Sequence, residues 1–180
     1  MIRKIIISCI AATSLILFST QAFALINISV GVPLSHTFTG KYNGGDEVKS
    51  DGVSGYFIQI GVPILPGIGM DSYKTKLKDW SDPTDLETSI YNLYYLLPIP
   101  VINITLGAGV GSTEIKFSGS EKYFDKGPAS QVYASLGFPI IPLFDLHLSY
   151  RSVSSKVKIK SGGEHDMGGN VMGLGIGFNF

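Results

Sequence analysis

Apolar and polar residues alternate along most of the chain after residue 25. Large apolar residues stand at every second position in six segments, which are 26–34, 58–64, 102–110, 132–140, 144–150 and 172–180. Alternation with a period of two is typical of a β-strand that buries one face. Segments 67–78 and 88–99 alternate less regularly, and the second is apolar on nearly all sides. We therefore predict eight strands and an all-β fold.

The two faces of these strands differ in the size of their side chains. One face is continuously aliphatic or aromatic, whereas the other carries mostly Gly, Ser, Thr, Asn and Gln. The interior of an eight-stranded barrel is only just wide enough for side chains, so the larger face would overfill it. We therefore expect the apolar face to point outward into lipid. The alternative is a soluble, lipocalin-like barrel with the apolar face inside.

The connections between the predicted strands alternate in length. Three are short and bracketed by proline, at 63–66, 98–100 and 139–142, whereas those at 39–52, 77–87, 117–129 and 154–169 are longer and polar. Short periplasmic turns and long extracellular loops are typical of transmembrane barrels. The sequence thus predicts an antiparallel up-and-down barrel, and the even number of strands places both termini in the periplasm.

Bulk composition agrees with a barrel in a membrane. Hydrophobic residues make up 44% of the chain and mean hydropathy is +0.27, yet no run of about 18 apolar residues follows the first 24. A formal net charge of +0 without a dense basic patch argues against nucleic acid as a partner.

The N-terminus has the pattern of a bacterial secretory signal. A basic start at 1–4 precedes an apolar run at 5–18 and the sequence Ala22-Phe23-Ala24, which predicts cleavage after Ala24. The alternative is an N-terminal membrane helix. Cys9, the one cysteine, lies inside this segment and too early for lipoprotein processing. We expect a signal peptide at 1–24 and one cysteine-free barrel domain at 25–180.

The last strand carries a family resemblance. It ends on Phe180, with large apolar residues at every second position before it, namely Phe178, Ile176, Leu174 and Met172. This strand, together with the pattern over 25–180, resembles the superfamily of small eight-stranded outer-membrane barrels, which includes the OmpA transmembrane domain, OmpX, OmpW and the opacity proteins. The resemblance implies a monomer in the outer membrane of a Gram-negative bacterium. It also implies that the insertion machinery reads these five residues as a signal.

Alternation places four ionisable residues inside the predicted barrel: Asp71, Asp145, His147 and Arg151. A charge in a narrow lumen needs a partner. We expect a network in which Arg151 pairs with a carboxylate from a neighbouring strand and closes the lumen. The alternative is a gated pore or a proton-linked path.

Two other sets of residues could carry chemistry. His147 and Ser149 resemble the His-x-Ser pair of outer-membrane lipid A deacylases, but they lie near the periplasmic end, point into the lumen, and are followed by Tyr150 where that family has Asn. Glu164 and His165 lie in a glycine-rich loop that turn chemistry explains better than a metal does. We therefore expect no catalytic site, no bound metal and no cofactor.

Six lysines form two combs at alternate positions: Lys74, Lys76 and Lys78, and Lys156, Lys158 and Lys160. If alternation holds, both combs point outward just above the apolar belt, where they could bind lipopolysaccharide phosphates. The alternative is a solvated loop edge, because apolar residues at 157 and 159 could mean that a bulge reverses the register.

The function that these features favour is non-enzymatic. We expect an outer-membrane barrel with a structural or surface-interaction role, in contact with lipid and lipopolysaccharide, whose four extracellular loops could bind an unidentified ligand. One alternative is a small OmpW-like channel for hydrophobic or small solutes. A less favoured one is a lipid A-modifying enzyme.

Overall fold

The computed structural model describes residues 26–42, 44–62, 65–78, 83–99, 102–117, 123–141 and 143–179. The predicted signal peptide and Phe180 lie outside these residues. No helix of the described part is long and apolar enough to cross a membrane. The chain forms one antiparallel sheet of ten strands: β1 (Asn27–Phe38), β2 (Ser50–Gly61), β3 (Gly67–Leu77), β4 (Thr84–Ile99), β5 (Ile102–Phe117), β6 (Phe124–Asp125), β7 (Gly127–Ile141), β8 (Phe144–Ile159), β9 (Glu164–Asp166) and β10 (Gly169–Asn179).

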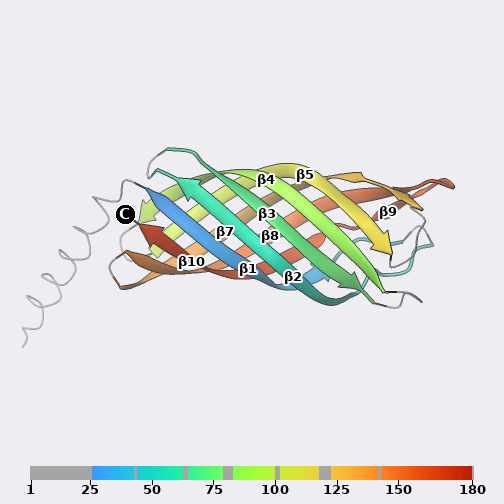
Figure 1. Ribbon diagram of the computed structural model, residues 1–180, viewed down its shortest axis with the longest axis horizontal. Coiled ribbons are helices and arrows are strands. Elements are labelled where there is room, and N and C mark those ends of the chain that lie inside the picture. Colours follow the sequence, from blue (N-terminus) through green and yellow to red (C-terminus); the bar gives the residue numbers. More distant parts are fainter. Residues whose placement is uncertain are drawn as a thin grey trace, which may run out of the picture.

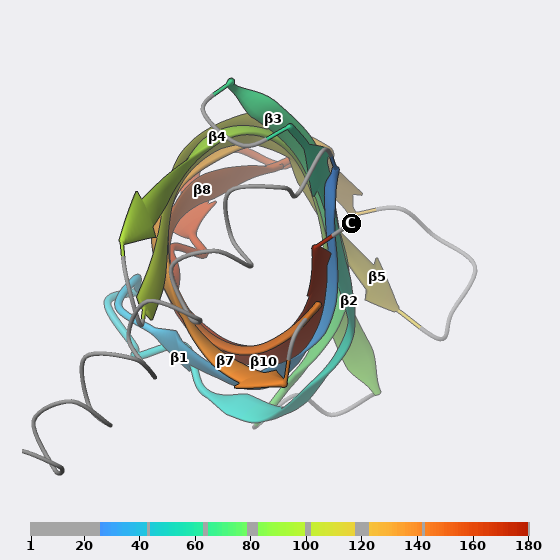
Figure 2. The ribbon, with the colours of Figure 1, turned by 90° about the vertical axis from the view of Figure 1, so that its left-hand side faces the viewer.

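Eight of the strands close into a barrel, and the short β6 and β9 are additions to β8. Around the ring the order is β1, β2, β3, β4, β5, β7, β8 and β10, and β10 pairs with β1 to close it. Figure 2 shows this ring end-on, and Figure 1 shows the tilted strands along its length. The predicted all-β, eight-stranded up-and-down barrel is confirmed.

The two ends of the barrel differ. We call the end where β1 begins and β10 ends the turn end, because the connections β2–β3, β4–β5 and β7–β8 there are short. The opposite end, which carries β9 in Figure 1, is the loop end. Several strands extend further toward the loop end than the sequence predicted, since β4 begins at Thr84 and β8 continues to Ile159.

The apolar face points outward, as predicted. Tyr91, Val110 and Ile140 are 66%, 70% and 65% exposed, and every long strand adds further exposed apolar residues to a continuous belt. A soluble lipocalin-like barrel, the alternative considered from the sequence, would bury this face. A barrel closed by ladders between neighbouring strands satisfies most of its backbone hydrogen bonds internally, and with an apolar outer belt it suits lipid surroundings.

The interior contains both polar and apolar layers. Toward the loop end, seven side chains form what we call the loop-end apolar cluster: Val48, Leu77, Leu86, Ile115, Phe124, Val157 and Met167. Three of these residues, Leu86, Val157 and Met167, are completely buried. This cluster explains why the strands are longer than predicted. Segments assigned to loops 77–87 and 154–169 carry inward apolar residues that become buried when the strands extend.

The orientation of the barrel in the membrane can be tested by thiol labelling. We expect cysteines introduced at Asp46 and Asp125, at the loop end, to react with a membrane-impermeant reagent on intact cells. Cysteines at Leu65 and Ile141, at the turn end, should stay unlabelled until the outer membrane is permeabilised. Labelling of the turn-end pair alone would mean that the barrel is inverted.

Candidate functional site

The inward face of β8 carries three of the four ionisable residues that the sequence places in the lumen, together with Ser149. Asp145, His147, Ser149 and Arg151 alternate with exposed residues along this strand, and all four are buried. Asp71 on β3 is completely buried as well. The structure thus places all four predicted lumen residues inside the barrel, but it divides them between two layers.

The central layer is an ion pair that crosses the barrel. Arg151 Nε donates a hydrogen bond to Asp71 Oδ2 at 2.9 Å, and the side chains are 3% and 0% exposed. In the ring order, β3 and β8 are opposite each other, with three strands between them on either side. The prediction that the partner of Arg151 comes from a neighbouring strand is therefore wrong. Alternation determines which face a residue occupies, but it cannot determine which strand lies across the lumen.

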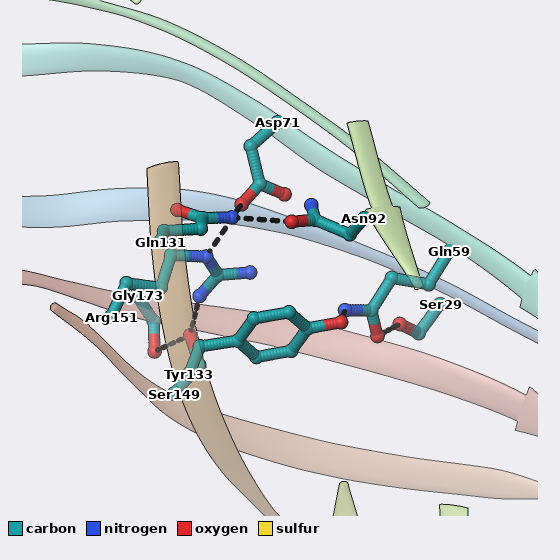
Figure 3. Close-up of polar contacts among 9 residues, drawn as sticks. All are labelled: Ser29, Gln59, Asp71, Asn92, Gln131, Tyr133, Ser149, Arg151 and Gly173. Atoms are coloured by element: carbon teal, nitrogen blue, oxygen red, sulfur yellow. Dashed lines mark hydrogen bonds and ion pairs between the residues drawn. The ribbon is translucent and has the colours of Figure 1, made fainter. Parts of the chain in front are cut away.

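Amide side chains complete the hydrogen bonding of this ion pair. Gln131 Nε2 donates to Asp71 Oδ2 at 2.5 Å and to Asn92 Oδ1 at 2.7 Å. Arg151 Nη1 donates to Ser149 Oγ, whose hydroxyl donates to the carbonyl oxygen of Gly173 at 3.2 Å. Figure 3 shows these bonds converging on the pair. Additional hydrogen bonds of this kind are what make a buried ion pair tolerable.

A second bridge runs beside the first. Gln59 Nε2 on β2 donates to the Tyr133 hydroxyl on β7 at 2.6 Å, and Ser29 Oγ donates to Gln59 Oε1 at 3.1 Å (Figure 3). β2 and β7 are also opposite strands of the ring. The Arg151 guanidinium carbon lies 3.5 Å from the centroid of the Phe57 ring and 5.0 Å from that of Tyr133. These cation–π contacts partly replace the water that the cation has lost.

Asp145 belongs to a separate layer at the turn end. Its Oδ2 accepts hydrogen bonds from Asn103 Nδ2 at 2.6 Å and Asn179 Nδ2 at 2.7 Å, and it lies 4.0 Å from His147 Nε2. Asn27 donates in turn to Asn179 Oδ1 at 2.7 Å. Alternation along the chain does not reveal this amide cluster, although all three asparagines lie at strand ends on the inward side.

A small cavity lies between Arg151 of one layer and His147 of the other, and apolar residues such as Val30, Phe57 and Leu174 line it together with polar ones. It has a volume of about 20 Å³, and its polar lining consists of Ser29, Gln59, Ser135, His147, Ser149 and Arg151. A cavity needs a volume of roughly 10–15 Å³, measured in the same way, to hold a water molecule. The cavity therefore has room for about one water between the layers.

The geometry does not assemble the hydrolase site considered from the sequence. Ser149 Oγ is engaged by Arg151 and by the Gly173 carbonyl, and among the described residues no general base hydrogen-bonds to it. Glu164 lies on β9 at the loop end, far along the barrel from Ser149, and its carboxylate is 3.9 Å from Lys156 Nζ. Serine attack requires a base within hydrogen-bond reach and a group that orients the base.

His165 is held by aromatic packing. Its ring centroid is 5.1 Å from that of Tyr42 and 5.5 Å from that of Phe124. Burial lowers the pKa of His165 below its ordinary value. Within the described ranges, no group of three or more His, Cys, Asp or Glu side chains is arranged to hold a metal ion.

The lysine combs point outward, but acidic neighbours accompany them. Val157 is completely buried, so the register of β8 does not reverse and Lys156 and Lys158 face outside. Lys74 Nζ is 2.6 Å from Glu87 Oε1, and Lys116 pairs with the same carboxylate. In the β8 ladders, Lys158 stands opposite both Glu164 and Asp125. The alternation of Asp85 and Glu87 has the same spacing as that of Lys74 and Lys76, and these acids stand opposite the two lysines, a pairing that the pattern of a single strand does not reveal.

The two buried aspartates should differ in their importance for stability. Asp71→Asn leaves the Arg151 charge buried without a counter-charge, so we expect a loss of about 3–5 kcal/mol in the free energy of unfolding. Asp145→Asn leaves a neutral oxygen that still accepts amide hydrogen bonds, and we expect a loss below about 2 kcal/mol. Urea unfolding in detergent micelles measures both. Equal losses would contradict the assignment of Asp71 as the main counter-charge.

Comparison with known proteins supports the fold. No family model matches the chain, and no curated protein matches it. Among solved structures, Neisserial surface protein A superposes with a TM-score of 0.61 at 16% identity, covering 86% of this chain and 97% of that one. Outer membrane protein W of E. coli gives 0.53 at 10% identity, covering 87% and 98%. The N-terminal β-barrel domain of Pseudomonas aeruginosa OprF gives 0.52 at 14%, covering 86% and 97%. The chain has the fold of the small eight-stranded outer-membrane barrels.

Proposed function

We propose that the protein is a non-enzymatic outer-membrane barrel that is closed to solutes and has a structural or surface-interaction role at its loop end. The observation that carries this proposal is that side chains cross the lumen from wall to wall. Asp71 and Arg151 join two opposite strands, and Gln59 and Tyr133 join another opposite pair. In a barrel of eight strands the interior is only just wide enough for such side chains.

The loop-end apolar cluster supplies a second seal above the polar one. Its members come from β3, β4, β5, β6 and β8 and from the segments around Val48 and Met167, so they converge from several sides of the ring. An ion on its way through the barrel would have to enter this apolar layer without hydrogen-bond partners, which is costly. A polar seal and an apolar seal in series favour a closed barrel over the channel alternative.

The apolar belt of the outer surface suits contact with lipid. Toward the loop end, the outer surface carries lysines and glutamates together. Lys74 and Lys116 share Glu87, and Lys156 lies near Glu164. We include lipopolysaccharide among the proposed partners, with the six predicted lysines as contacts. Pairing with carboxylates weakens Lys74 and Lys156 as phosphate ligands. Insertion by the outer-membrane machinery and a monomeric state are further parts of the proposal.

Single-channel recording tests the closed barrel. We expect the refolded protein in a planar lipid bilayer to give no stepwise conductance, because both seals block the lumen. A porin reconstituted in the same bilayers shows that the assay detects channels. A Tyr150→Ala variant, altered only on the lipid-facing side, should be equally silent. Reproducible conductance steps from the unmodified protein would favour the small-solute channel instead.

The enzyme alternative has a separate readout. Lipid A extracted from cells that produce the protein should have the same mass as lipid A from cells that produce Ser149→Ala. A lighter species that depends on Ser149 would contradict the non-enzymatic assignment.

A further inference from the structure

The seam between β1 and β2 is joined over only part of its length. The two strands pair from Asn27–Gly61 to Gly31–Phe57. Beyond this point β1 continues along β10 as far as Phe38, and β2 continues along β3 as far as Ser50. Each strand therefore stays paired with its other neighbour, β1 with β10 and β2 with β3. No ladder joins 32–38 to 50–56 in the described structure. We call this unpaired stretch the upper seam.

Irregularities in both strands account for the interrupted ladder. In β1, the register with β10 shifts between Pro33 and Ser35, which leaves one extra residue in β1. In β2, the register with β3 shifts between Ser50 and Val53. Gly52 and Gly55 have φ values of 121° and 148°, which residues with side chains rarely adopt. Bulged strands bend and lose pairing locally, so two facing bulged strands cannot share a regular ladder.

A side chain bridges the upper seam from inside the barrel. The bulge in β1 turns His36 inward, where it is 4% exposed. Its Nδ1 lies 2.8 Å from Thr75 Oγ1, and Thr75 is on β3, the strand beyond β2. The hydrogen bond therefore ties β1 to β3 across β2, at a level where no ladder joins β1 to β2.

The surroundings of His36 favour a neutral imidazole. Its ring packs against Phe38 at 4.2 Å and edge-on against Tyr73 at 5.9 Å between centroids. Its Nε2 has no hydrogen-bond partner among the described residues and faces Gly169. In a protonated imidazole both ring nitrogens carry a hydrogen. The Nε2–H would then have no acceptor, and the positive charge would lie in an apolar layer.

No free carboxylate on the surrounding strands could accept that charge. The inward faces around His36 carry Val53 and Phe57 on β2, Val171 on β10 and Val153 on β8. Among the described residues, the titratable groups near this region are Tyr73 on β3, the Asp71–Arg151 pair below it, in which Asp71 is already engaged, and the exposed Asp166, whose Oδ1 accepts the Gly168 N–H. The lysines of β3 point outward.

We propose that His36 is an acid-released latch. The neutral imidazole holds the upper seam closed, and protonation of His36 lets the seam open to water. Opening gives the imidazolium access to water, which the closed barrel denies it. The closed seam is therefore favoured above the ordinary titration range of histidine and loses stability as the pH falls below it. No covalent change is involved.

A cysteine at Val53 reports on the seam. Val53 lies on β2 inside the upper seam and is only partly buried against the apolar residues around Phe57. Cys9, the one cysteine of the sequence, lies in the predicted signal peptide and is replaced by Ser in all variants. The probe is 4,4′-dithiodipyridine, with each rate divided by that of a free thiol at the same pH. The matched control is Val153→Cys, in the same apolar cluster but on β8.

We expect Val53→Cys to react roughly 10- to 100-fold faster at pH 4.5 than at pH 7.5, because an exposed imidazole takes up a proton near pH 6.5. Val153→Cys should change little. Adding His36→Gln to Val53→Cys should remove the pH dependence, whereas adding His147→Gln should leave it intact. Equal acceleration at both cysteines, or the same pH dependence with Gln at position 36, would overturn the latch.

Amide hydrogen exchange of the protein without these substitutions gives an independent readout if a variant fails to refold. Segment 50–56 is paired on one side only, with β3, so release of the His36 bridge should let this edge fray. After correction for intrinsic exchange rates, this segment should lose protection on acidification, while segment 104–111, paired on both sides, keeps it. Unchanged protection of segment 50–56 between pH 7.5 and 4.5 would also overturn the proposal.

Discussion

The interior of this barrel is organised around one buried ion pair between opposite walls. Arg151 and Asp71 are both removed from water, and neither could remain charged at acceptable cost without the other. The pair determines what surrounds it: amides that fill the remaining hydrogen-bonding positions, and aromatic rings that cover the guanidinium. Because the partners lie on β3 and β8, the interaction also connects halves of the ring that no backbone ladder joins directly.

The layers on either side of the ion pair follow from the same constraint. Toward the turn end, Asp145 has no arginine and is satisfied by asparagines. Toward the loop end, the lumen becomes apolar, and long strands continue because their inward residues have a core to join. Outside, the apolar side chains of every long strand are exposed, and such a belt suits contact with lipid. The proposed closed barrel and the proposed latch use different parts of this arrangement, since the latch at His36 lies where the β1–β2 ladder is interrupted.

Alternation along the chain predicted the parts of the structure that depend on one strand at a time. It gave the number of long strands, the outward apolar face, and the inward positions of Asp71 and Arg151. Alternation carries no information on which strands face each other across the lumen, so the predicted partner of Arg151 is on a neighbouring strand, whereas the observed one, Asp71, is on the opposite strand. The strand extensions at Leu86 and Val157 were missed because their burial depends on a cluster assembled from distant segments. His36 was also missed, because a one-residue bulge reverses the face that simple alternation assigns to it.

The most direct test of the cross-barrel ion pair is a double-mutant cycle. The free energies of unfolding of the parent protein, Asp71→Asn, Arg151→Gln and the double variant are measured in the same detergent. We predict a coupling energy of roughly 3–5 kcal/mol, about the size of the larger single loss, so that the double variant is about as stable as the milder single one, because it leaves no charge buried alone. Additive losses, with a coupling energy within about 0.5 kcal/mol of zero, would show that the two charges do not depend on each other and would contradict the account.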